Sequence, residues 1–238
     1  RLGIYGNEDP MYILAGLPFI APDYSSAWLL KDVQMEYLQE KFDKKGLMIL
    51  YTAPWPGQGF YTKFPVNSVS DFSGKKLRIY STATQQMGSM LGFNATILPF
   101  AEIPQAFSTG LIEALFTSPQ TGIDIQAWDN TKHFTYAGAI FSKNAVVVTK
   151  KAFNALSKGD QSNMLAAAKK AELRGWEMSA ETTKKQIDIL KKNGMSSKNA
   201  PDEVISKMKS IGLEMMKNWR SKASPEANAV LDRYLSMR

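Results

Sequence analysis

The chain has 238 residues, of which 44% are hydrophobic and 21% charged, a composition that excludes a disordered protein. It contains no cysteine, which excludes disulfides, thiolate metal sites and cysteine nucleophiles. The net charge of +7 is uneven: residues 1–149 carry 11 Lys and Arg against 12 Asp and Glu, a net −1, whereas residues 150–238 carry 18 against 10, a net +8.

The first 150 residues alternate between helical patterns and short apolar runs. Residues 31–44 predict an amphipathic helix because apolar residues recur there at helical spacing. Pro54–Gly59 is rich in proline and glycine and predicts a loop. The alternation indicates an α/β fold with a largely parallel sheet. We expect strands over 47–51, 77–80, 95–98, 111–116, 134–140 and 145–149, and further helices over 84–91 and 102–108.

After Lys150 the character of the sequence changes. Ser157 and Asp160 have the spacing of a capping box, and a helical pattern without proline follows as far as Asn193 and Gly194. A helix of more than about thirty residues exceeds the usual globular length, so we expect it to bridge two lobes. We expect two shorter helices, one from Pro201 to about Arg220 and one from Ser224 onward.

The basic excess of residues 150–238 falls on these helices. Lysines occur in pairs at 169–170, 184–185 and 191–192, with acidic residues between the pairs. Neither an arginine cluster nor interleaved aromatic residues accompany them, so a solvated helix face is favoured over a nucleic-acid interface. The nucleic-acid alternative predicts DNA binding with steep salt dependence.

Several kinds of chemistry lack their sequence signature. The chain has one histidine, His133, and no Gly-x-Ser-x-Gly elbow for a hydrolase triad. It has no phosphate-binding glycine loop and no cluster of metal-ligand residues, so no cofactor and no metal are expected. No apolar run approaches the length of a transmembrane helix. This pattern favours binding over catalysis.

Arg78 is a charged residue in a short apolar strand. Its planar guanidinium can grip a carboxylate with two parallel hydrogen bonds. The alternative is an arginine on an edge strand that reaches only water.

Five segments together resemble the periplasmic solute-binding proteins of TRAP transporters. They are Leu17-Pro-Phe-Ile20, Asp71-Phe-x-Gly-x-Lys-Leu-Arg-Ile79, Leu91-Gly-x-Asn-Ala95, Pro99-Phe-x-Glu-Ile103 and Ala106-Phe-x-Thr-Gly-Leu-Ile-Glu113. The resemblance implies a two-lobed α/β fold, similar to periplasmic binding proteins, with mixed or parallel sheets and a long bridging helix. It also implies an organic-acid ligand between the lobes, a periplasmic location and a membrane permease as partner.

The resemblance also suggests how the chain is divided. Residues 1–75 are expected to belong to lobe one and 76–145 mainly to lobe two. Residues 146–180 return to lobe one and begin the bridging helix, and 181–238 hold its end and the C-terminal helices. Family members usually extend about 60–80 residues further at the N-terminus, so we expect part of lobe one to lie outside this sequence.

By the same resemblance Arg78 is expected to hold the ligand carboxylate. Where many members have glycine and a polar pair, this chain has Ala114 and Phe116-Thr117, which disfavours a sugar acid and leaves Phe116 as a wall. Each aromatic residue could instead be ordinary core. The expected ligand contacts are Arg78, Gln58, Thr117, Phe116, Ser118, Asn144, Phe100, Tyr80 and Trp55.

We therefore predict a binding protein that captures an organic-acid anion and delivers it unchanged to a permease. The apolar Leu115-Phe116 pair favours a monocarboxylate with an apolar or aromatic body. One alternative is a sensor that hands the ligand to a signalling receptor. Another is an enzyme on the same two-lobed fold, for which only Glu102, Glu113 or Asp124 could serve as acid or base.

Overall fold

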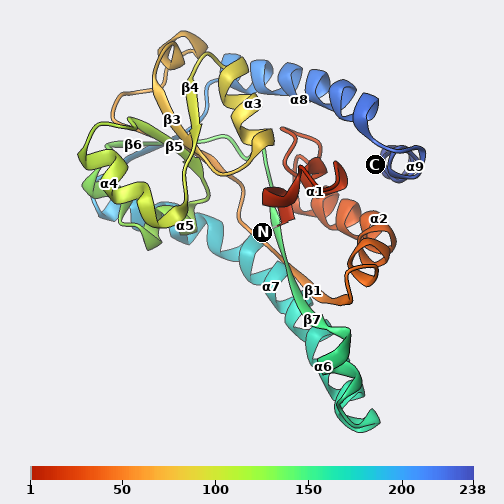
Figure 1. Cartoon of the computed structure of the whole chain (residues 1–238). Helices are drawn as coiled ribbons and strands as arrows, with labels where there is room; N and C mark the ends of the chain where they lie inside the picture. Colours follow the sequence, from red (N-terminus) through yellow and green to blue (C-terminus); the bar gives the residue numbers. More distant parts are fainter. Residues whose placement is uncertain (1) are drawn as a thin grey trace.

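The computed structural model describes residues 2–238, which form two β-sheets with helices around them (Figure 1). The strands are β1 (Leu47–Pro54), β2 (Gly59–Thr62), β3 (Lys76–Ile79), β4 (Asn94–Ile97), β5 (Ala114–Thr117), β6 (His133–Tyr136), β7 (Lys143–Thr149) and β8 (Ser196–Asn199). The α-helices are α1 (Met11–Leu14), α2 (Tyr24–Asp43), α3 (Thr82–Met90), α4 (Ile103–Ser108), α5 (Pro119–Asp124), α6 (Lys150–Asn154), α7 (Lys158–Lys192), α8 (Asp202–Lys222) and α9 (Pro225–Met237). Short 3-10 helices are η1 (Leu2–Tyr5), η2 (Val69–Phe72), η3 (Phe100–Glu102) and η4 (Ala127–Asp129).

The larger sheet has six strands in the order β4-β3-β5-β2-β6-β8 and is mixed. Strand β3 runs parallel to β4 and β5, as the alternation predicts. Strand β6 runs parallel to β8, a strand that the sequence analysis did not predict. The expectation of a largely parallel sheet is wrong at β2, which is antiparallel to both of its neighbours. All four β2 residues are buried, so this strand lacks the polar–apolar alternation by which a strand is recognised.

The smaller sheet pairs β1 with β7 in antiparallel register. The segments that connect it to the larger sheet, 55–58 and 137–142, run side by side. The Trp55 N–H donates to the Ser142 carbonyl at 2.7 Å, and the Gly138 N–H donates to the Gln58 carbonyl at 2.9 Å. The two connections therefore form one junction between the sheets.

Helix α7 is the long helix that the sequence predicts. The Ser157 hydroxyl accepts from the Asp160 N–H at its start, and Gly194 with φ of +86° follows its end. It contacts β1 of the smaller sheet, and it also contacts α5 and β8 beside the larger one (Figure 1). The helix therefore bridges the two sheets, as expected.

Some element boundaries differ from those expected. Helix α2 begins at Tyr24 rather than at 31, because the Asp23 carboxylate accepts from the Ser26 N–H and caps it there. Strand β6 stops at Tyr136 rather than at 140, since Gly138 adopts φ of +62° and turns the chain.

The division of the chain into residue ranges for the two lobes stays a prediction. The position of strand β2 is relevant to this division. Strand β2 lies in the range 1–75, which is expected in lobe one, and yet it pairs with β5 in the larger sheet.

Four phenylalanines form the centre of the core beside the larger sheet. The Phe60 ring lies 4.9 Å from Phe72, 5.8 Å from Phe93 and 4.8 Å from Phe116, between ring centroids. Phe60, Phe72 and Phe116 are fully buried. Each such ring contributes a large buried apolar area, so this cluster holds β2, β5 and the β3–β4 region together.

Candidate functional site

Arg78 lies on β3 with only 4% of its surface exposed. Its Nε and Nη2 donate to the Leu98 carbonyl at 3.1 and 2.9 Å. It lines a cavity of about 440 Å³ together with Tyr80 and Phe100. The remaining lining residues are Ile4, Asn7, Ser81, Thr82, Ile97, Leu98 and Pro99.

The wall of this cavity combines positive charge with apolar surface. Phe100 and Ile97 expose 52% and 41% of their surfaces, which offers an apolar face. Helix α3 begins at Thr82 in the same wall, and the positive end of its dipole favours an anion there, although the Ser81–Thr84 capping box already occupies the N–H groups of Ser81 and Thr84. A buried guanidinium, a helix start and an aromatic wall suit a small organic acid whose body is apolar.

Gln58 lies behind the cavity and reaches it through Tyr80. The Tyr80 hydroxyl donates to Gln58 Oε1 at 2.7 Å, and Gln58 Nε2 donates to Ser142 Oγ at 3.0 Å. Gln58 is fully buried. The side chain therefore ties the end of β3 to the junction between the sheets and holds Tyr80 in the cavity wall.

The other five predicted contacts do not line this cavity. Trp55 Nε1 donates to Asn144 Oδ1 at 3.2 Å beside the junction. Phe116 packs in the aromatic core, and Thr117 is buried at the end of β5. Ser118 caps α5, where its hydroxyl accepts from the Thr121 N–H at 3.2 Å. As ligand contacts these five remain predictions, and the structure gives four of them, Trp55, Asn144, Phe116 and Ser118, a packing, pairing or capping partner.

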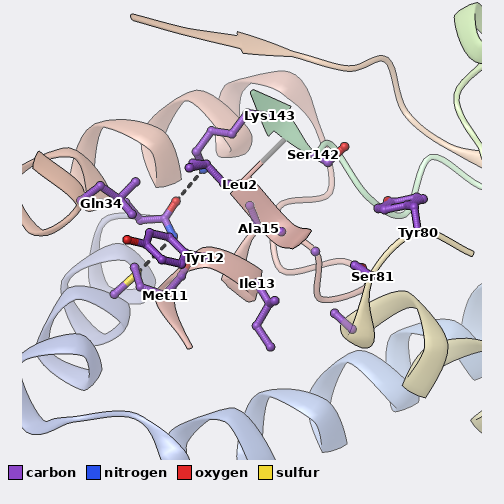
Figure 2. A pocket seen from close by; sticks show the side chains of 14 residues that line it. Leu2, Met11, Tyr12, Ile13, Ala15, Gln34, Tyr80, Ser81, Ser142 and Lys143 are labelled. Atoms are coloured by element: carbon purple, nitrogen blue, oxygen red, sulfur yellow. Dashed lines mark hydrogen bonds between the residues drawn. The ribbon is translucent and has the colours of Figure 1, made fainter. Parts of the chain in front are cut away.

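Lys143 is a buried ionisable residue that the sequence analysis did not single out. It opens β7, and its Nζ donates to Gln34 Oε1 at 2.6 Å (Figure 2). Both residues line an internal cavity of about 20 Å³, which Tyr80 and Ser142 also line. Burial, and after it the positive charge of Lys31, lowers the pKa of Lys143 to about 7. The available signal was a charged residue just before the apolar run of β7.

The lowered pKa of Lys143 predicts that stability depends on pH. Between pH 7 and 10.5 the unfolded chain holds the lysine proton and the folded chain does not, so the free energy of unfolding should rise with pH across that window. The expected slope from this group is at most about 1.4 kcal/mol per pH unit. Urea unfolding of the wild type and of Lys143→Met from pH 7 to 10 measures it.

In Lys143→Met this slope should disappear, and stability at pH 7 should increase. The exposed Lys151 offers a matched control, because Lys151→Met removes the same charge without removing a buried one. Equal slopes in the wild type and in Lys143→Met would show that the buried amine stays charged.

The residues that an enzyme would need lie outside the Arg78 cavity. Among the described residues, neither His133 nor Glu102, Glu113 or Asp124 lines it. Burial and the charge of Lys198 lower the pKa of His133. Within residues 2–238, no group of three acidic or histidine side chains is placed to hold a metal ion. No helix in the same range has the length and apolar character that a bilayer crossing requires.

Residues 2–222 match the family model of bacterial extracellular solute-binding proteins, family 7 (DctP). A solute-binding protein of Chromohalobacter salexigens is 24% identical over 196 residues, a match that covers 79% of this chain and 57% of that protein. The chain therefore spans less than two thirds of the length of this relative.

Solved structures of similar proteins share the fold. DctP7 of Bordetella pertussis, an extracytoplasmic solute receptor that binds pyroglutamic acid, is 37% identical with a TM-score of 0.95, covering 98% of this chain and 77% of that chain. A TRAP solute-binding protein from a marine metagenome, in complex with co-purified pyroglutamate, is 31% identical with a TM-score of 0.93, covering 99% and 77%. The predicted two-lobed binding-protein fold and the predicted resemblance are confirmed by these matches.

Proposed function

Because this chain belongs to family 7 of the bacterial extracellular solute-binding proteins, we propose that it captures a small organic-acid anion in the periplasm and delivers it to a TRAP-type permease. The observation that carries the proposal is the buried Arg78 in the wall of a cavity of about 440 Å³, beside Tyr80 and Phe100. The guanidinium binds the carboxylate, and closure of the lobes excludes water and adds contacts. The ligand leaves unchanged.

Within this class we propose pyroglutamate as the ligand to test first. Two structures that are 37% and 31% identical to this chain come from proteins that bind it. Pyroglutamate has one carboxylate, which suits a single buried arginine, and a compact ring, which suits the cavity and its exposed aromatic wall. Each charge-assisted hydrogen bond from Arg78 is worth about 1.5–3 kcal/mol.

A thermal-shift screen tests the proposal. The panel holds pyroglutamate, proline, and aliphatic, dicarboxylic and aromatic acids. A ligand at a hundred times its dissociation constant adds about 2.7 kcal/mol to the free energy of unfolding. For a chain of this size that corresponds to about 5–11 °C in Tm. A folded protein that shifts with none of the carboxylates would contradict the proposal.

A further inference from the structure

A second hollow lies between the 18–22 segment and helices α8 and α9. It is a groove of about 520 Å³, and it shares no lining residue with the Arg78 cavity. Phe19, Leu213 and Met216 supply much of its apolar wall, and Lys209 and Arg238 also line it. None of its described lining residues is acidic.

The apolar wall of this groove is open to solvent. Leu213 is 60% exposed, more than any other large hydrophobic side chain among the described residues. It lies on α8 one turn from Lys209 and less than one turn from Met216, so the three side chains share one face of the helix. Such a combination of exposed leucine and hollowed apolar surface is typical of an interaction site.

The backbone holds the groove in one shape. Phe19 adopts φ of +56°, an unfavourable conformation for a bulky residue, and its N–H donates to the Ala139 carbonyl at 2.8 Å. Gly212 lets α8 approach this segment, because a Cβ there would lie 2.0 Å from the Pro18 carbonyl oxygen. A groove fixed in this way requires little ordering when a partner binds.

We propose that this groove is a docking site for an acidic segment of a partner protein. Apolar side chains of that segment insert against Leu213, Met216 and Phe19, while its carboxylates pair with Lys209 and Arg238. Arg238 already donates Nη1 to the Ile20 carbonyl at 3.1 Å, and its other guanidinium donors serve the partner. The net +8 of residues 150–238 attracts an acidic partner over a longer range.

A protein segment fits this surface better than a membrane does. The apolar residues line a concave groove, which accepts inserted side chains, whereas a bilayer takes a protruding apolar face. The apolar anchors lie on one face of α8 within two turns, which matches the spacing of anchors on an amphipathic helix.

A pair of synthetic peptides tests the proposal. Each is a helix-forming peptide of about 15 residues with leucines along one face. One carries glutamates on the flanks of that face and the other carries lysines. Fluorescence anisotropy against the whole protein at low salt should give saturable binding of the acidic peptide, at least about tenfold tighter than of the basic one, with weakening at physiological salt.

Matched variants locate the binding site. Leu213→Asp and Leu213→Ser should remove binding of the acidic peptide, whereas Leu165→Asp should not, because Leu165 is 47% exposed on α7 and outside the groove. Lys209→Glu should weaken binding, whereas Lys207→Glu, on the same helix and also outside the groove, should leave it unchanged. Equal Tm values across the variants establish that all of them are folded.

Three outcomes would overturn the proposal. They are equal affinity for both peptides, no binding of either, and equal losses in Leu213→Asp and Leu165→Asp. A further experiment measures binding of the protein to vesicles of phosphatidylcholine and phosphatidylglycerol. Binding to those vesicles that depends on Leu213, without binding of the acidic peptide, would assign the groove to a membrane surface instead.

Discussion

Replacing Arg78 with methionine should weaken carboxylate binding by about a hundred- to ten-thousand-fold while the protein stays folded. Two charge-assisted hydrogen bonds are lost, each worth about 1.5–3 kcal/mol, and about 1.4 kcal/mol changes the affinity tenfold. Methionine keeps the apolar stem inside β3, so most of the packing of this buried residue survives. Titration calorimetry with the best ligand of the acid screen measures the change.

Replacing Arg78 should also destabilise the protein in the absence of ligand. The Leu98 carbonyl loses the two donors that it accepts from Nε and Nη2, which should lower the free energy of unfolding by about 1–3 kcal/mol. Arg78→Lys is the matched control, since it keeps the charge and loses the planar fork, and it should bind with intermediate affinity. Unchanged affinity in Arg78→Met would make the arginine structural only.

The second large effect distinguishes Phe116, which is buried in the core, from Phe100, which lines the Arg78 cavity. Phe116→Ala should lower the free energy of unfolding by about 3–5 kcal/mol, because the ring is fully buried and packs 4.8 Å from Phe60. That loss corresponds to about 6–20 °C in Tm. Phe100→Ala should change stability by less than about 0.5 kcal/mol, because the ring is 52% exposed.

The two variants should show the opposite order in ligand binding. Phe100→Ala removes part of the apolar wall beside Arg78 and should weaken the affinity, whereas Phe116 does not line that cavity. Urea unfolding gives the free energy of unfolding of each variant, and titration calorimetry gives its affinity for the ligand. If Phe116→Ala were stable and failed to bind, Phe116 would be the ligand wall that the sequence analysis expected.

Much of the fold could be predicted from local patterns. The helix over 158–192 has a serine cap, no proline and a glycine after its end, so its length was visible in the sequence. The strand–helix alternation from 76 to 117 gave β3, β4 and β5 with small boundary errors. Strand β2 was missed because it is buried on both faces, and β8 because Ser196–Asn199 carries no apolar pattern at all.

The site was only partly predictable for a similar reason. Arg78, Tyr80 and Phe100 lie near one another in sequence motifs, and the structure brings them to one cavity. The hydrogen bonds of Gln58 to Tyr80 and Ser142 join three segments that are distant in sequence, and no local sequence pattern predicts them. The partner of Lys143 lies 109 positions away on α2, so its burial became evident only in three dimensions.

The most direct test of the account compares pyroglutamate with its primary amide by titration calorimetry. The two molecules share the lactam ring and differ in the carboxylate that Arg78 is proposed to bind. The account predicts that pyroglutamate binds and that the amide binds at least about a hundredfold more weakly. Equal affinity for the two, or binding of the amide alone, would contradict the claim that a buried arginine recognises the acid.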